Sequence, residues 1–243
     1  MEEIEAEVER KGMALSGAKT PYQCAMYGKW KWLEQFYKDK PMEVVGQLTT
    51  NNDTALHVVA SAGHNNVLHS LISLIDERIF WMSGHALKME NNHGNTPLHE
   101  VAVSGNLEAA KHLMDAAIKF KSIDPSYEDV LGIRNRLGET PLYKAAALGS
   151  TKLVKYLAGQ VQQDVESHFK REKDEISILH IAIIGQHFET AFWLLKKYPD
   201  LAKKKENNGL TSLQLLAHMP SAFEAKFHKS IWKMFIYESF QSK

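Results

Sequence analysis

The sequence predicts an all-α fold, a solenoid of about six helix-turn-helix units with short β-turn tips and two long insertions between units. A four-residue motif, cleanest in the TPLH stretch that starts at Thr96, recurs in register along the chain. Small residues follow each copy, and a second run of apolar residues at helical spacing comes next. One such unit cannot bury its own apolar face, whereas stacked units can. The other copies start at Thr54, Thr140, Ser177 and Thr211.

Each residue type in the motif has a physical reason. The Thr96 hydroxyl can cap a helix, and Pro97 suits the first helical position, where no backbone donor is needed. Leu98 and the following small residues give a narrow apolar face, so neighbouring helices can approach closely. Gly105 suits a helix end that requires positive φ. The turns before four of the five motifs carry Gly94, Gly138, Gly209 or, in the earliest copy, Asn52, which tolerates the left-handed region.

This pattern resembles the ankyrin repeat, which has a T-P-L-H-x-A signature and a period of about 33 residues. The resemblance covers most of the chain from about residue 20 and is specific because the motif recurs in register. It implies an array over residues 20–220, preceded by an N-terminal cap or tail (1–19) and followed by a C-terminal capping helix (221–243). The units are anchored near positions 21, 56, 98, 142, 179 and 213.

The first unit, from Thr20 to about Pro41, is degenerate. Alignment of Gly28 with Gly105 places Tyr22 in the His position of the motif, and a second, aromatic helix starts near Trp30. We interpret these aromatic residues as core or cap, because aromatics at helical spacing usually pack. The alternative is an aromatic docking surface.

Two intervals are longer than the expected period of about 33 residues: 42 residues separate Leu56 from Leu98, and 44 separate Leu98 from Leu142. The extra residues fall near 76–90 and 119–134, and the second stretch includes a turn signal at 124–126. Insertions in repeat arrays usually map to one face. We therefore expect both insertions on the same side of the array.

The later copies depart from the pattern. Tyr143 replaces His, Glu175 takes the turn Gly position, and Gln186 takes the helix-end Gly position, which leaves that helix end undetermined. Residues 222–240 place apolar side chains at near-helical spacing. This stretch predicts the C-terminal capping helix, with an exposed partner-binding helix as the alternative.

Composition argues against several classes of function. The chain has 29 Lys plus Arg and 29 Asp plus Glu, so it has no general attraction to nucleic acid. No apolar run approaches the ~20 residues that cross a bilayer, so we expect no membrane insertion by this chain itself. A single cysteine, Cys24, excludes an internal disulfide framework. These features predict a cytoplasmic protein, or one at the cytosolic face of a membrane if it is part of a longer chain.

No catalytic, metal or cofactor site is expected. Of the 12 His, three (His57, His99 and His180) occupy the His position of the motif, where the ring is expected to bond to backbone of the neighbouring turn. The sequence has no HExxH, no phosphate-binding Gly-rich loop and no GxSxG. The lysine run at 203–205 is read as solvated surface rather than a nuclear signal.

Repeat arrays present an extended concave surface built from turn tips and first helices. Leu137 and Leu148 are apolar at positions expected to face solvent, and they are the best sequence indication of a contact patch. Alignment of the units predicts the following partner-binding positions: Thr50, Asn51, Asp53, Ser61, Asn92, His93, Asn95, Val103, Ser104, Arg136, Leu137, Glu139, Ala147 and Leu148.

The sequence thus predicts a non-catalytic protein-protein interaction module, with the partner's identity and the oligomeric state left open. The long units and the stretches TPYQCAMYGKW and NNDTALHVVASAGH resemble plant ankyrin proteins that carry a membrane-spanning PGG domain after the repeats. That resemblance implies a role in plant defence or stress signalling. The alternative is the cytosolic half of a membrane-anchored regulator, truncated before its transmembrane domain. The third hypothesis is a nuclear co-regulator.

Overall fold

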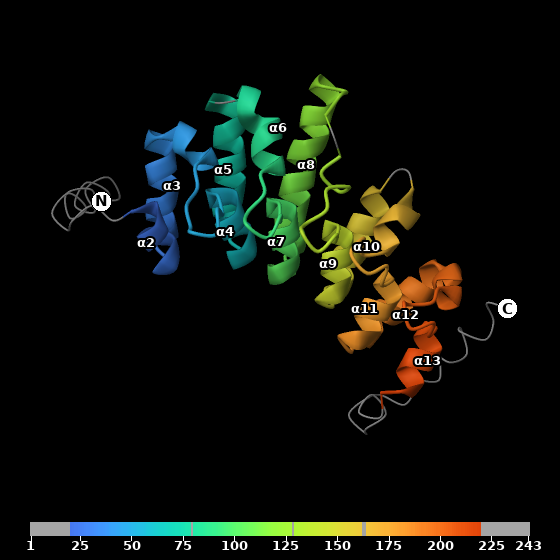
Figure 1. Ribbon diagram of the computed structural model, residues 1–243. Helices are drawn as coiled ribbons and strands as arrows, with labels where there is room; N and C mark the ends of the chain where they lie inside the picture. The colour runs from blue at the N-terminus through green and yellow to red at the C-terminus, as the bar shows by residue number, and fades with distance from the viewer. Residues whose placement is uncertain (1–19, 79, 128, 162–163, 220–243) are drawn as a thin grey trace.

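The computed structural model describes residues 20–78, 80–127, 129–161 and 164–219. In this part of the chain the regular elements are helices, with two isolated β-bridges, Lys170 to Ser177 and Lys205 to Thr211. The helices stack side by side into an elongated, curved array (Figure 1). The predicted all-α repeat solenoid is confirmed.

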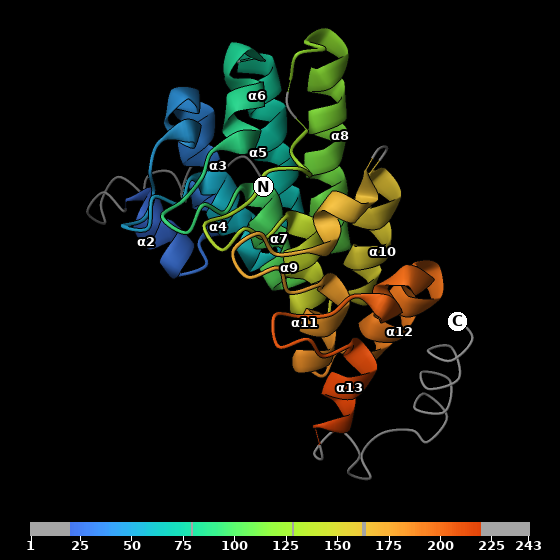
Figure 2. The same cartoon turned by 45° about the vertical axis from the view of Figure 1, so that its right-hand side comes forward.

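The array has two rows of helices. The inner row lines the concave side, at the lower left of Figure 1, and the outer row lies on the opposite side, above and to the right of it. The turned view in Figure 2 shows the same two rows. The inner row is α2 (Pro21–Met26), α4 (Ala55–Ala62), α7 (Pro97–Ser104), α9 (Pro141–Ala147), α11 (Ile178–Ile184) and α13 (Ser212–Ala217). The outer row is α3 (Trp30–Asp39), α5 (Asn65–Arg78), α8 (Leu107–Ile123), α10 (Thr151–Gln160) and α12 (Phe188–Lys197).

Four short elements lie between or beside these rows. They are η1 (Pro41–Val45), α6 (Phe80–Lys88), η2 (Val165–Phe169) and η3 (Pro199–Lys203). Neighbouring helices contact within each row, α7 between α4 and α9 and α8 between α5 and α10. The predicted N-terminal cap or tail (1–19) and C-terminal capping helix (221–243) lie outside the described residues.

The inner helices begin at the hydroxyl residues that the motif predicts. Thr96 has an extended backbone, and its hydroxyl lies 2.9 Å from Nδ1 of His99 in the first turn. Pro97 takes the first helical position. The Thr140 hydroxyl accepts from the Tyr143 N–H at 3.3 Å, and the Ser177 hydroxyl accepts from the His180 N–H at 3.3 Å. Each cap satisfies a backbone donor that the first turn of a helix would otherwise leave unpaired.

Left-handed residues end these helices and shape the turns before them. Gly105 ends α7 with φ of 64°, as predicted. Gln186 adopts the same conformation with φ of 58°, so α11 ends without a glycine at that position. Asn52 and Glu175 have φ of 61° and 58° in the turns where other units have glycine. These three residues carry a backbone strain that glycine would avoid.

The core runs between the two rows as one continuous cluster. Four of the predicted leucine anchors are 2% exposed or less, and Leu213 of the last unit is half-buried. Small residues such as Val101 and Ala102 in α7 are also buried, which lets the inner helices pack closely. The fully buried anchors are Leu56, Leu98, Leu142 and Leu179.

The predicted register of the first unit was wrong. Gln23, not Tyr22, holds the His position, because the Gln23 side chain completes the capping box with Thr20. Tyr22 is 45% exposed. One residue fewer separates Thr20 from Gly28 than Thr96 from Gly105, so an alignment on the glycines shifts the cap by one position.

The two insertions pack against each other on one side of the array, as expected. The first extends α5 and adds α6, and the second lengthens α8 and adds a turn at 124–127 (Figure 1). The Tyr127 hydroxyl donates to the Gly84 carbonyl at 3.0 Å, and the Lys88 ammonium lies 4.7 Å from the centre of the Tyr127 ring. The Phe120 ring meets Tyr127 edge to face with ring centres 4.8 Å apart.

Gly84→Ala is expected to lower the free energy of unfolding by about 1–3 kcal/mol, because the new methyl group would overlap the Phe120 ring. Urea denaturation measures this change. Gly159→Ala in α10 is the matched control, since nothing lies within 4 Å of a Cβ there. The control should be neutral or stabilising. Equal stability of the two variants would mean that α6 does not pack on α8.

Candidate protein-binding face

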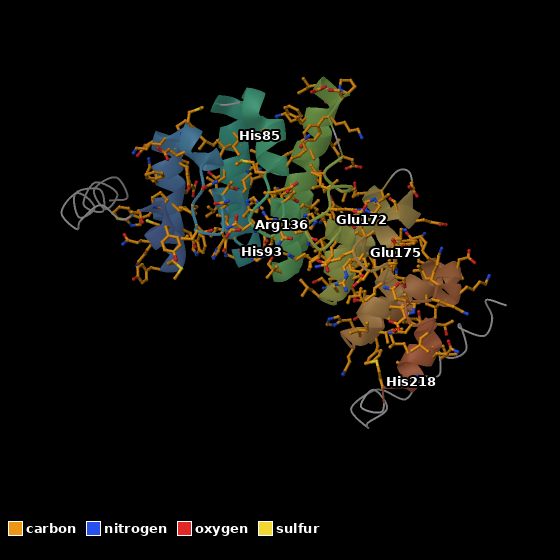
Figure 3. All side chains as sticks on the ribbon, in the orientation of Figure 1. His85, His93, Arg136, Glu172, Glu175 and His218 are labelled. Atoms are coloured by element: carbon orange, nitrogen blue, oxygen red, sulfur yellow. The ribbon has the colours of Figure 1, made fainter. Side chains whose placement is uncertain are left out.

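Backbone hydrogen bonds hold neighbouring turn tips in a row. The Asn92 N–H donates to the Asn51 carbonyl at 2.7 Å, and the Arg136 N–H donates to the His93 carbonyl at 2.9 Å. Figure 3 shows Arg136 beside His93 near the middle of the array. These bonds fix the distance between adjacent tips, so side chains from successive units form one continuous surface.

A ladder of buried polar side chains lies beneath the tips. The Asn135 amide donates to Asn95 Oδ1 and to Glu139 Oε2, each at 3.0 Å, and the Asn95 amide donates to Glu100 Oε1 at 2.7 Å. Arg171 pairs with Glu139 at 3.3 Å. Asn95 and Glu139 are only 5% and 7% exposed. The prediction that they are exposed binding positions was therefore wrong, because their side chains join one unit to the next.

The motif histidines also join units, as the sequence predicts. A carbonyl oxygen only accepts, so the ring nitrogen facing it must carry the proton, and the other nitrogen accepts from the cap residue. In α7, His99 Nδ1 accepts from the Thr96 N–H at 3.2 Å. The Nε2 atom of each ring contacts a backbone carbonyl oxygen of the next unit. The pairs are His57 with Asn95 (2.8 Å), His99 with Glu139 (2.9 Å) and His180 with Leu210 (3.1 Å).

Burial keeps these three rings neutral. Desolvation lowers the pKa of His57, His99 and His180 below the usual 6.5, and in His99 it lowers the pKa to about 4. The backbone bonds oppose this shift but are weaker than the effect of burial. Among the described residues, no group of three or more His, Cys, Asp or Glu could hold a metal ion.

Tyr143 fills the same position in α9 but makes no equivalent bond. The side chain is fully buried, its hydroxyl has no hydrogen-bond partner, and burial raises its pKa. A buried hydroxyl without a partner loses its bonds to water and gains none in return.

Tyr143→Phe is therefore expected to leave the free energy of unfolding unchanged or to raise it by up to about 1 kcal/mol. Thermal and urea denaturation of the purified variant measure this. A loss of more than about 1 kcal/mol would show that the hydroxyl has a stabilising partner.

The structure places most of the predicted binding positions on the tips and the inner row. Val103, Leu137 and Leu148 are 55%, 44% and 47% exposed, so the apolar side chains do face solvent. The other exposed positions are Thr50, Asn51, His93, Ser104 and Arg136. Half-buried positions are Asp53, Ser61, Asn92 and Ala147.

Some of these positions also hold the tips together. Asp53 accepts from the Asn91 amide at 2.7 Å, and the Asn92 amide donates to the Thr50 carbonyl at 3.1 Å. The Ser104 hydroxyl donates to the Ala60 carbonyl at 2.9 Å. Substitutions at Asp53, Asn92 or Ser104 would therefore change tip geometry as well as any contact surface.

Sequence reasoning missed two parts of this face. Ile184 in α11 is 43% exposed and lies seven residues after its cap, as Val103 does in α7. Tyr27, just after α2, is 74% exposed. Counting seven positions from the cap residue finds Tyr27 after Thr20 and Ile184 after Ser177, whereas counting from Gly28 misses Tyr27 by one position. We call Tyr27, Val103, Leu148 and Ile184 the apolar row; they lie at or just after the C-terminal ends of α2, α7, α9 and α11, while the half-buried Ser61 lies at this end of α4.

These features define a repeat solenoid with an extended surface of tips and inner helices. The sequence model of ankyrin repeats in three copies matches residues 22–124 and 126–206. The chain therefore belongs to the ankyrin-repeat family. Members of this family are typically interaction scaffolds for protein partners rather than enzymes.

A solved structure shows the same fold. It is the crystal structure of the ankyrin repeat domain of Bcl-3, described as a unique member of the IkappaB protein family. The TM-score is 0.61 at 17% identity, with 88% of this chain and 89% of that chain covered. A search of curated proteins found no match. None of the described helices is long and apolar enough to cross a membrane.

Proposed function

We propose that this chain is a non-catalytic protein-binding module whose concave face holds the partner, with Leu137 and Leu148 near the centre of the contact. The exposed Leu137 and the apolar row together carry this proposal. Burial of apolar surface contributes about 25 cal/mol per Å², and buried anchors near the centre of an interface supply most of its energy. The predicted binding positions other than Asn95 and Glu139 belong to the proposed surface.

The proposal is tested by affinity capture from an extract of the native tissue, with the wild-type chain and a Leu137→Asp, Leu148→Asp double variant. We expect the double variant to lose the captured partner by at least ten-fold, because two carboxylates would be buried against it. Ile118→Asp, Ile123→Asp is the matched control, since both isoleucines are exposed on the outer helix α8.

Circular dichroism confirms that each variant is folded. Equal capture by the wild type and the Leu137, Leu148 double variant would reject the concave face. Loss of capture only in the α8 variant would place the binding surface on the outer row.

The finer predictions stay predictions from the sequence. A role in plant defence, a membrane-anchored longer protein and a nuclear co-regulator are not addressed by the family match or by the Bcl-3 neighbour. A cytoplasmic location likewise stays a prediction.

A further inference from the structure

Two histidines from neighbouring units meet on the outer row of helices. His69 lies on α5 and His112 on α8, and these two helices pack side by side (Figure 1). Their ring centres are 4.8 Å apart, with the ring planes inclined at 68°. His69 is exposed and His112 is half-buried. The two residues lie far apart in the sequence, so no local spacing motif reveals the pair.

The ring nitrogens of this pair are not used to hold the fold together. Within the described part of the chain, neither ring makes a hydrogen bond. The motif histidines differ, because both nitrogens of a ring such as His99 are bonded. A neutral imidazole nitrogen with a free lone pair is the commonest metal ligand among side chains. The pair therefore offers donor atoms that the packing of α5 on α8 does not need.

A cavity of about 190 Å³ lies between α5 and α8 at the two rings. It is also lined by Ser73, one turn after His69, and by Asp115, one turn after His112. Metal-bound histidines usually donate their second nitrogen to a carboxylate, a carbonyl oxygen or water, which fixes the ring. Asp115 is placed to accept such a bond, and its charge offsets that of Lys119, which lines the same cavity. The cavity also has room for water beside an ion.

The distance between the rings fits one shared metal ion. Zn²⁺ binds an imidazole nitrogen at about 2.0–2.1 Å, and that nitrogen lies about 1.1 Å from the ring centre, so the ion lies about 3.2 Å from the centre. Angles at the ion of about 90° or 109° then place two ring centres about 4.5 or 5.2 Å apart. The observed 4.8 Å falls between these values. Rotation about χ2, whose axis runs through the ring, turns the nitrogens toward the ion and leaves the ring centre in place.

We infer that His69 and His112 bind one divalent transition-metal ion that prefers imidazole, Zn²⁺ or Cu²⁺, and that this ion joins α5 to α8. Two nitrogen ligands do not suit Mg²⁺ or Ca²⁺, which take oxygen ligands. The described residues include no group of three or more His, Cys, Asp or Glu that could hold a metal, so water completes the coordination of the ion. The site lies on the outer row, apart from the proposed concave binding face.

Calorimetric titration of the full chain tests this site, with protein that carries no histidine tag and has been freed of metal by a chelator. We expect about one ion of Zn²⁺ or Cu²⁺ per chain, with Cu²⁺ bound more tightly than Zn²⁺. Mg²⁺ should not bind. His69→Ala and His112→Ala should each weaken the binding of both ions at least ten-fold, because each leaves a single protein ligand.

His93→Ala, His218→Ala is the matched control, since it removes two other exposed histidines. It should change the affinity less than two-fold. Electron paramagnetic resonance of the Cu²⁺ complex counts the bound nitrogens directly. We expect two imidazole nitrogens in the wild type and one in either single variant. Circular dichroism checks that every variant is folded.

Wild-type affinity in either single variant would overturn the inference, as would binding of Mg²⁺ as tight as that of Zn²⁺. An equal loss in the His93, His218 variant would also overturn it, because the ion would then be held by scattered surface histidines. The inference does not depend on the proposed function, since a variant that lacks the metal site keeps the concave face.

Discussion

Leu98→Ala is expected to lower the free energy of unfolding by about 2–5 kcal/mol. Leu98 is 2% exposed and anchors α7 between the two rows, so its removal leaves a cavity that the stacked helices cannot close. The loss should spread to adjacent units, because each unit of a repeat array is stabilised by its neighbours. Urea denaturation followed by circular dichroism measures the change.

Arg136→Ala is the matched control for this substitution. Arg136 is exposed at a tip, and its side chain makes no ion pair with a described residue, so the change should stay within about 0.5 kcal/mol. Equal destabilisation by the two substitutions would show that the assignment of core and surface is wrong.

Acidification from pH 7 to pH 4 is expected to destabilise the array by an amount on the order of 3 kcal/mol through His99 alone. The folded pKa of about 4 lies below the ordinary value of 6.5, so the unfolded chain binds more protons between these values. The contribution is fully present above pH 6.5 and is lost as the pH falls toward 4. His57 and His180 act in the same direction, because burial lowers their pKa as well.

His99→Gln separates this effect from general acid denaturation. Gln23 and Gln214 hold the equivalent position in α2 and α13, so glutamine can complete the cap. We expect a flatter dependence of stability on pH between 4 and 6.5. At pH 7 we expect a loss of about 1 kcal/mol, because the bond to the Glu139 carbonyl is removed.

His93→Gln, at an exposed tip, is the control and should keep the wild-type profile. An unchanged pH profile in His99→Gln would mean that another group causes the acid sensitivity. Stability is measured by urea denaturation at each pH for the wild type and both variants.

The sequence predicts the stacking of units well, because each motif residue acts within its own unit. Thr96 caps, Pro97 starts the helix and Leu98 is buried, and each of these roles follows from local chemistry. The exposure of Leu137 and Leu148 also follows from the alignment of the units. The same local logic predicts that both insertions lie on one side.

Other features depend on contacts between units, which no single unit reveals. Asn95 looks like an exposed tip residue until Asn135 of the next tip is placed against it, and Glu139 does so until Arg171 of the following tip is placed against it. The separate helix α6 forms because the insertion before residue 90 finds a partner in the turn at Tyr127, 43 residues after Gly84. The first unit was misaligned because a one-residue deletion moves its cap relative to its glycine.

Hydrogen-deuterium exchange of the chain, alone and with its captured partner, tests the central claim most directly. Binding to the concave face predicts slower exchange in the tip and helix spanning residues 136–148 and in α11, with the outer helices α8 and α10 unchanged. Slower exchange confined to α8 and α10 would contradict a concave binding surface.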